Sequence, residues 1–247
     1  MSNQPELKYA VDHDEVFYQD EVRRIREVYK QRKVGGNSAG LTPMDLRGRC
    51  AIHEREELLV RVFRKQGLST LAGLKILDVG CGAGAMLGRL FDYGAEPENC
   101  FGVDIIEERL HFAKHLRPNI NFILASGAQL PFPDAIFDFV FQFLLFTSVL
   151  DPDIKCTIAA EILRTLRRGG RLIWYDFAYN NPQNPDVKGI GRREIRKLLP
   201  GCRLDFWRLT LAPPVGRAAV RISPLLYRVL SQVPLLRTHY LCVAEKL

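Results

Sequence analysis

The sequence predicts an α/β fold built on a doubly wound, mostly parallel sheet, and three observations indicate it. First, the branched and apolar run Ile76–Val79 leads directly into a glycine-rich turn, which is typical of a buried strand followed by a helix. Second, short apolar runs and helical patterns alternate along the rest of the chain, as in parallel strands joined by crossover helices. Third, the last two strands follow each other without a regular crossover helix of the earlier type, which indicates one antiparallel edge strand.

Seven strands are expected, each of them a short run rich in branched or aromatic residues. They are 76–79, 100–103, 120–124, 137–143, 171–177, 203–211 and 239–245. Helical patterns cover about 14–33, 43–66, a segment that starts near Gly84, 107–116, 154–168 and 192–199. We expect Gly169 and Gly170 to end the helix 154–168, because glycine readily adopts the left-handed conformation found at helix C-termini.

The chain is expected to form one domain with two additions. Residues 1–66 are too short to be a separate domain, so we interpret them as a helical cover, or lid, over the open end of the sheet. Within that cover, the segment 35–40 (GGNSAG) predicts a flexible link that can act as a hinge. The main domain then spans 67–247 and carries an insertion at 212–237, between its last two strands.

Composition and charge exclude several classes of protein. No apolar run reaches the roughly 18 residues that a membrane span needs, and the acidic N-terminal residues do not suit a signal peptide. The six cysteines lack any Cys-x-x-Cys pair, so we expect reduced thiols in a cytoplasmic protein, with neither a disulfide framework nor a metal site. The net charge of +7 is carried mainly by late arginines, which suit nucleic acid, anionic lipid or a phosphorylated substrate, or simply solvated helix faces.

The turn after the first strand carries the features of a cofactor site. Its three alternating glycines, Gly80, Gly82 and Gly84, allow a tight reversal and bring backbone N–H groups close to a ligand. Asp78 lies just before the turn, at the carboxyl end of its strand, where ligands bind in open α/β sheets. Asp104 ends the next strand, at the spacing from which an acidic residue binds ribose hydroxyls. This combination predicts a nucleoside-bearing cofactor.

Together these segments resemble the class I S-adenosylmethionine-dependent methyltransferases of the small-molecule type, over roughly residues 71–177. Residues 76–84 (ILDVGCGAG) resemble the family's first motif, and 102–104 (GVD) resemble its ribose-binding acid. Two later stretches, 130–140 and 163–172, resemble the segments that lead into the family's fourth and fifth strands. The resemblance implies a Rossmann-like fold, S-adenosylmethionine as the cofactor and S-adenosylhomocysteine as its product.

The resemblance also implies which residues hold the cofactor. Asp104 would accept hydrogen bonds from both ribose hydroxyls, Asp78 would lie near the amino group, and Arg49 or Arg47 would pair with the carboxylate. Ser126 stands where the family usually has an acidic residue that holds the adenine. The other cofactor contacts are assigned to the glycine turn and to neighbouring strand ends: Gly80, Cys81, Gly82, Gly84, Ile105, Gly127, Ala128, Gln142 and Phe143.

The residues that would carry the reaction are less evident. A hydroxyl acceptor benefits from a general base within hydrogen-bond reach. Related enzymes often have a histidine after the fourth strand, but this chain has 146–148 (FTS) there. Asp176 is the first candidate because it lies at the carboxyl end of a strand, and Tyr175 and His53 are the alternatives. No metal is expected.

The resemblance therefore predicts an enzyme that moves a methyl group from S-adenosylmethionine to a small molecule, preferentially on oxygen. A hydroxyl of a sugar, polyketide, quinone or lipid-like metabolite would suit the aromatic residues near the fourth and fifth strands. Three alternatives stay open: an RNA methyltransferase that uses the basic half, a nicotinamide oxidoreductase, and a non-catalytic partner that keeps the cofactor fold. As the binding partner of this chain, nucleic acid is less favoured than a small-molecule acceptor.

The insertion 212–237 allows more than one interpretation. Ser223 suits a helix N-cap and Pro224 the first helical position. The apolar residues that follow are expected to share one face of a helix: Leu225, Leu226, Val229, Leu230 and Val233. That face would pack on the sheet edge or cap the acceptor pocket. Alternatively, with Arg217, Arg221, Arg228 and Arg237 around it, it would meet lipid at the periphery of a membrane or a lipid-linked substrate.

Overall fold

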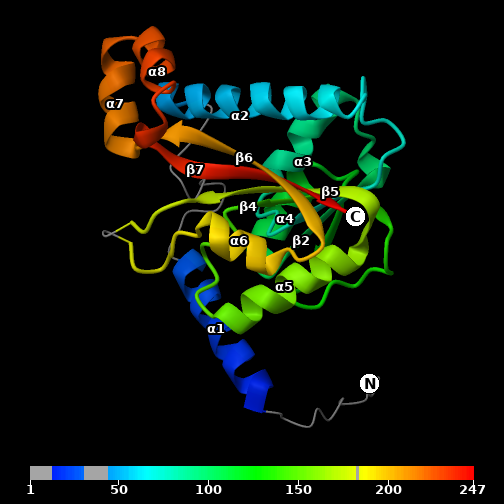
Figure 1. Ribbon diagram of the computed structural model, residues 1–247. Helices are drawn as coiled ribbons and strands as arrows, with labels where there is room; N and C mark the ends of the chain where they lie inside the picture. Colours follow the sequence, from blue (N-terminus) through cyan, green and yellow to red (C-terminus); the bar gives the residue numbers. More distant parts are fainter. Residues whose placement is uncertain (1–12, 31–43, 182–183) are drawn as a thin grey trace.

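A computed structural model describes residues 13–30, 44–181 and 184–247 of the chain. Its centre is a seven-stranded sheet in the order β3-β2-β1-β4-β5-β7-β6 (Figure 1). The strands are β1 (Ile76–Val79), β2 (Cys100–Asp104), β3 (Asn121–Leu124), β4 (Phe137–Phe143), β5 (Leu166–Phe177), β6 (Cys202–Leu211) and β7 (Arg237–Lys246). The pairs from β3 to β5 are parallel, whereas β7 is antiparallel to both β5 and β6. The predicted fold class is confirmed, with the antiparallel strand β7 next to the outermost strand β6.

Helices cover both faces of the sheet (Figure 1). On one face α2 and α3 pack, and their Leu59 and Leu87 join a core that contains Phe141. On the other face α5 packs with α6, and Ile162 joins a core that contains Trp174. The helices are α1 (His13–Lys30), α2 (Leu46–Lys65), α3 (Ala85–Leu90), α4 (Glu107–Leu116), α5 (Pro152–Thr165), α6 (Arg192–Leu198), α7 (Pro213–Ile222) and α8 (Pro224–Leu230), with 3-10 turns η1 (Phe91–Tyr93), η2 (Pro97–Asn99) and η3 (Pro234–Leu236). Among the described helices, none is long and apolar enough to cross a membrane.

The predicted helix 154–168 is too long, and its glycine cap is wrong. The helix ends at Thr165, and Leu166 already has extended backbone angles and pairs with Phe137 of β4. The register between β4 and β5 then shifts before Arg171. Gly169, with a φ of +72°, lies in this irregular segment, so the glycines serve a bend inside β5 and not a helix terminus. Burial of Leu166, which is fully inaccessible, outweighed the helical pattern.

The two N-terminal helices cover different parts of the molecule. α2 lies along one face of the sheet (Figure 1), and the side chain of Asp45 caps it by accepting a hydrogen bond from the Gly48 N–H at 3.1 Å. α1 lies instead against the carboxyl ends of the parallel strands, where Val22 and Ile25 line a cleft together with Asp104. The predicted flexible link 35–40 and the residues before α1 lie outside the described residues.

The insertion folds as a pair of helices, α7 and α8, followed by η3. The predicted start of α8 is confirmed, because the Ser223 hydroxyl accepts the Leu225 N–H at 3.1 Å and Pro224 takes the first position. The predicted single apolar face is wrong. Leu226 and Leu230 pack inward around the buried Tyr227, whereas the remaining three residues of that face (Leu225, Val229 and Val233) are exposed.

Candidate active site

The glycine turn after β1 has a backbone that side chains would disrupt. Gly80 has a φ of +74° and Gly84 a φ of +69°, both in the left-handed region that favours glycine. A Cβ at Gly84 would lie 2.6 Å from the Phe122 ring, and one at Gly80 would lie 3.1 Å from Leu145. The turn is held to β2 because the N–H groups of Gly80 and Cys81 both donate to the Val103 carbonyl, at 2.8 and 3.0 Å. The backbone is therefore preformed for the close approach of a ligand.

Asp104 is fixed by the backbone around it. One carboxylate oxygen accepts the Gly82 N–H at 2.8 Å and the other accepts the Ile106 N–H at 2.9 Å. Burial raises the pKa of Asp104, and these backbone hydrogen bonds oppose that rise. Each carboxylate oxygen keeps accepting capacity for further donors, so Asp104 can bind a pair of ligand hydroxyls.

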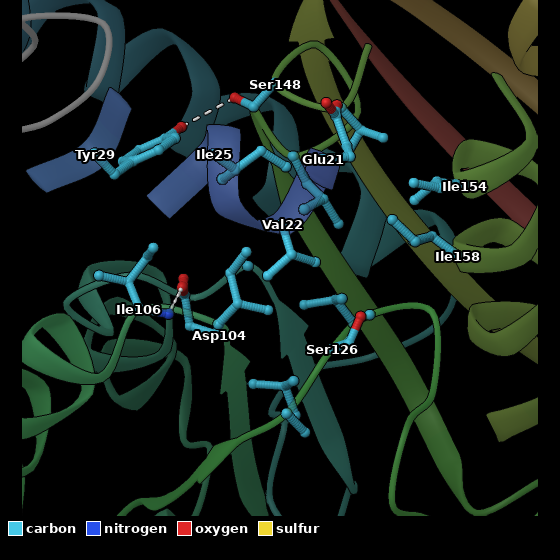
Figure 2. Close-up of a pocket in the computed structure, with 18 of the residues that line it drawn as sticks. Glu21, Val22, Ile25, Tyr29, Asp104, Ile106, Ser126, Ser148, Ile154 and Ile158 are labelled. Carbon is cyan, nitrogen blue, oxygen red and sulfur yellow. Dashed lines mark hydrogen bonds between the residues drawn. The ribbon is translucent and has the colours of Figure 1, made fainter. Parts of the chain in front are cut away.

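A cleft of about 790 Å³, its open mouth included, lies over this end of the sheet. Figure 2 shows Asp104, Ile106 and Ser126 on one side of it and Glu21, Val22, Ile25 and Tyr29 of α1 on the other. Six of the predicted cofactor residues line the cleft: Gly80, Asp104, Ile105, Ser126, Gly127 and Phe143. Six others are not part of its wall: Asp78, Cys81, Gly82, Gly84, Ala128 and Gln142.

These neighbours have local roles in the structure. The Ser126 hydroxyl accepts the Ala128 N–H at 3.0 Å, and the Gln142 side-chain oxygen accepts the Leu145 N–H at 3.3 Å. Asp78 is buried at the end of β1, and burial together with the nearby Asp104 raises its pKa to about 8. A cationic ligand group near Asp78 would favour its ionised form.

α1 is fastened over the cleft by polar contacts as well as by its apolar residues. Glu21 accepts the Leu150 N–H at 2.6 Å and pairs with Arg24 at 2.6 Å. Arg24 in turn donates to the Ser148 carbonyl at 2.6 Å, and the Tyr29 hydroxyl is 2.9 Å from that of Ser148 (Figure 2). The wall formed by α1 is thus tied to the loop that follows β4.

The cleft suits S-adenosylmethionine in the character of its walls. Asp104 offers a carboxylate for the ribose diol, and the glycine turn, whose glycines lack a Cβ, lies beside it. Apolar side chains, among them Val79, Ile106 and Ile158, offer a slot for the planar base, with the Ser126–Gly127 backbone at its edge. The residues present therefore fit a nucleoside cofactor.

Two predicted site residues of α2 lie away from this cleft. Arg49 and His53, one helical turn apart, face an outer groove between α2, α8 and β6, and His53 lies 3.1 Å from Glu57. The prediction of Arg49 as a cofactor ligand and of His53 as a catalytic residue is corrected on this ground. Arg55 instead points to the sheet, where it lies over the Phe143 ring. Its positive charge opposes the rise in the pKa of Asp78.

Asp176 does not reach the cleft either, because side chains alternate along β5. Trp174 belongs to the core under α5 and Tyr175 to the opposite core, so Asp176 follows Trp174 to the face under α5. There it is fully buried and accepts the Thr147 hydroxyl at 2.6 Å and the Thr147 N–H at 3.3 Å. Asp176 therefore anchors the loop after β4 and is not placed as a catalytic base.

Tyr175, the second candidate, forms part of an aromatic cluster beside the cleft. The aromatic cluster consists of Phe143, Tyr175, Phe177 and His239, all at the carboxyl end of the parallel strands. The ring centroids of Phe143 and Tyr175 are 5.4 Å apart, and His239 stacks on Tyr175 at 4.8 Å. Phe143 lines the cleft as well, so the aromatic cluster continues directly from the candidate cofactor site.

Polar groups of α2 and β6 border the aromatic cluster. The Tyr175 hydroxyl lies 2.7 Å from the Thr210 hydroxyl, and burial raises the pKa of Tyr175 to about 12. Thr210 has a φ of +62°, rare for a β-branched residue, and its N–H donates to Glu54 at 3.0 Å. Arg55 lies over the Phe143 ring at 4.9 Å. Strained backbone of this kind is frequent at functional sites.

His239 presents an imidazole lone pair within this cluster. The Thr238 hydroxyl lies 3.2 Å from the Thr210 carbonyl and 3.1 Å from His239 Nδ1, and in the tautomer in which it donates to the carbonyl it accepts from Nδ1–H. Nε2 is then the unprotonated nitrogen, and it has no hydrogen-bond partner among the described residues. Burial and the nearby Arg55 lower the pKa of His239 to about 3, so the imidazole is neutral.

Sequence reasoning missed His239 and Arg55. The signal for His239 was the antiparallel last strand, since the start of an antiparallel strand lies at the same sheet edge as the ends of its parallel neighbours. Arg55 had no comparable signal, because the face of α2 that turns to the sheet depends on packing.

Comparisons with known proteins agree with this geometry. Residues 77–174 match a family model described as a methyltransferase domain. An O-methyltransferase of Aspergillus nomiae is 31% identical over 147 residues, which is 54% of this chain and 63% of the relative. A demethylmenaquinone methyltransferase of Lactococcus lactis is 32% identical over 147 residues, or 58% of this chain and 56% of the relative. The chain thus spans less than two thirds of the length of these relatives.

Solved structures extend the similarity to nearly the whole fold. A geranyl diphosphate C-methyltransferase of Streptomyces coelicolor, crystallised with S-adenosyl-L-homocysteine, has a TM-score of 0.62 at 14% identity, covering 92% of this chain and 98% of that one. A protein of Pyrococcus horikoshii has a TM-score of 0.61 at 19% identity, covering 90% of this chain and 99% of that one. At these identities the likeness concerns the fold.

Proposed function

Since the chain contains a methyltransferase domain of the class I S-adenosylmethionine-dependent family, we propose that it methylates a hydroxyl of a small, largely apolar metabolite. The sulfonium of S-adenosylmethionine supplies an activated methyl group. The observation that carries the proposal is the lone pair of His239 Nε2, buried within the aromatic cluster beside the cleft. A flat, apolar acceptor would pack against Phe143, the member of the aromatic cluster that lines the cleft, and the cluster would have to open for its hydroxyl to donate to the buried Nε2.

Within the protein, positioning is the main requirement. Holding the acceptor oxygen in line with the methyl group can contribute about 7–11 kcal/mol. His239, whose pKa is about 3, is too weak a base to ionise a hydroxyl beforehand, so it orients the oxygen by accepting a hydrogen bond. Transfer would form the O–C bond as the sulfur–methyl bond breaks, with S-adenosylhomocysteine as the neutral thioether leaving group, and Nε2 would take the proton of the strongly acidic oxygen.

The relatives support a hydroxylated, planar acceptor. Two of them, at 31% and 32% identity, are O-methyltransferases, and others are quinone C-methyltransferases. Quinols, hydroxylated polyketides and lipid-like phenols share a flat or apolar body with a nucleophilic hydroxyl, whereas a sugar offers less to an aromatic wall.

The RNA alternative receives less support from the surface. Several late arginines are engaged within the protein: Arg167 pairs with Asp138 at 2.7 Å, and Arg164 with Asp134 at 2.7 Å. Arg192 lies over the Phe206 and Tyr240 rings. Paired and stacked guanidiniums are less able to neutralise phosphates.

The test is methyl transfer from labelled S-adenosylmethionine to a panel of phenols, quinols, polyketides, sugars and RNA, followed by mass spectrometry. His239→Phe keeps a ring in the stack and removes the lone pair, so kcat/KM should fall about 100-fold or more while cofactor affinity stays unchanged. His239→Gln, which returns an amide near the Nε2 position, should recover part of that loss. Transfer to RNA alone, or cofactor binding without transfer to any acceptor, would contradict the proposal.

A further inference from the structure

Apolar side chains gather on the outer surface of the insertion. Among the described residues, twelve large apolar side chains are exposed, and five of them fall within residues 222–235. We call these five the hairpin tip: Ile222, Leu225, Val229, Val233 and Leu235, with exposed fractions from 42% to 85%. Three of them continue along one side of α8 and the turn after it, at i, i+4 and i+8 (Leu225, Val229 and Val233).

The charge along the insertion has a single sign. From residue 206 to residue 244 the sequence has no aspartate or glutamate and has five arginines. Arg217, Arg221 and Arg228 are exposed, and none of them forms an ion pair with another described residue. Arg208 and Arg237 instead donate to backbone carbonyls within the fold, of Pro234 and Arg208 respectively. The hairpin tip is thus aliphatic, and α7 and α8 also carry three exposed arginines that form no ion pair with a described residue.

We propose that the hairpin tip docks on an anionic lipid bilayer. Aliphatic side chains at the end of an amphipathic helix enter the boundary between headgroups and acyl chains. Arginines beside them keep their guanidiniums at the level of the lipid phosphates while their stems cover apolar surface. Arg221 and Arg228 directly precede Ile222 and Val229 in the chain, so each arginine lies about 100° around its helix from an aliphatic side chain of the hairpin tip.

Two other occupants fit the surface less well. A second copy would form a two-fold interface, which places the same patch on both sides. The exposed arginines of the two insertions would then face each other without an acidic residue of the insertion between them. Protein interfaces are also rich in tyrosine and tryptophan at their centres, and the hairpin tip has only isoleucine, leucine and valine. The hairpin stands at one end of the molecule (Figure 1), where a flat bilayer has free access.

The inner side of the hairpin is packed independently of its tip. Tyr227 is 2% exposed and lies in one cluster with Leu211 and Ala219. Gly216 of α7 lies against the Arg47 side chain of α2, where a Cβ would come within 3.2 Å. Substitutions on the exposed side should therefore leave the fold intact.

The experiment measures co-sedimentation of the full chain with vesicles of phosphatidylcholine, with and without phosphatidylserine. The wild-type chain is expected to bind the vesicles that contain phosphatidylserine and to be released by salt. Leu225→Ser with Val229→Ser should lower the partition coefficient roughly tenfold or more, and Arg221→Gln with Arg228→Gln should do the same on anionic vesicles.

Matched controls distinguish binding through the hairpin tip from non-specific binding of vesicles by exposed leucines or arginines elsewhere. Leu116→Ser with Leu124→Ser removes equally exposed leucines (50% each), one of them on β3 at the opposite edge of the sheet. Arg168→Gln with Arg193→Gln removes the same charge elsewhere, and both controls should bind as the wild type does. The proposal is overturned if the wild type ignores anionic vesicles, if the controls lose as much binding as the tip variants, or if ultracentrifugation shows a dimer that the tip variants dissociate.

Discussion

Burial decides how the acidic residues at the carboxyl ends of the strands behave. Asp104 lies between two backbone N–H donors and faces the cleft, so it stays available to a ligand. Asp176 is equally close to a strand end but is enclosed, and burial raises its pKa to about 7. The two carboxyl groups differ in function because of the face on which each side chain lies.

Asp176→Asn should leave methyl transfer within about twofold of the wild type, because the amide oxygen still accepts the Thr147 donors. The pKa of Asp176 is higher in the folded than in the unfolded chain, so its protonated form stabilises the fold. This contribution to the free energy of unfolding is complete below the unfolded-state pKa, near 4, and is lost as the pH rises to about 7. The variant's stability relative to the wild type should therefore increase over that range and stay constant above it. Chemical denaturation at several pH values measures this.

Asp176→Leu is the contrasting variant. It leaves the buried Thr147 hydroxyl and N–H unpaired and should cost about 1–3 kcal/mol of stability. If Asp176→Asn abolished transfer while S-adenosylhomocysteine still bound, Asp176 would be a catalytic residue after all.

Among the elements, the strands were predictable to within about two residues at most ends because they are short, apolar and bounded by turns. The bounds of α4 and α6 were predicted equally well, but the end of α5 and the faces of α2 and α8 were not. The helix before β5 ends where Leu166 finds a partner in β4, and α8 buries Tyr227 in place of Leu225. Both outcomes depend on neighbours distant in sequence, as does the placement of Arg49 outside the cleft.

α1 offers a test of an element as a cover. Glu21→Ala removes the acceptor of the Leu150 N–H, which ties α1 to the loop after β4, and the partner within α1 that orients Arg24 toward the Ser148 carbonyl. Charged hydrogen bonds contribute about 1.5–3 kcal/mol, so cofactor affinity should fall by about tenfold or more, through faster dissociation. Stopped-flow fluorescence and calorimetry with S-adenosylhomocysteine measure the rate and the affinity.

The matched control lies on the same helix. Asp20 also pairs with an arginine three residues on, Arg23, but both side chains are exposed. Asp20→Ala removes the same charge and should leave dissociation unchanged. Equal dissociation rates for Glu21→Ala and the wild type would mean that α1 does not hold the cofactor in place.

For the molecule as a whole, the order of strands and helices followed from the alternation of patterns, and the glycine turn with Asp104 marked the candidate cofactor cleft. The aromatic cluster could not be predicted in the same way. It joins Phe143, Tyr175 and His239 from three strands, and only the antiparallel insertion of β7 brings His239 beside Tyr175. The proposed acceptor side of the site therefore depends on topology, whereas the glycine turn and Asp104 of the candidate cofactor side lie in one continuous βαβ segment.

Cofactor binding should be visible as stability of the entire chain. A ligand at 100 times its dissociation constant stabilises the folded state by about 2.7 kcal/mol, which corresponds to a rise in Tm of about 5–10 °C for a chain of this size. S-adenosylhomocysteine should produce that shift and NAD should not.

Asp104→Asn should remove most of the shift, because the second carboxylate oxygen becomes an N–H donor facing the Gly82 or Ile106 N–H. His239→Phe lies outside the cleft and should keep the shift, so equal losses in both variants would argue against separate cofactor and acceptor sides.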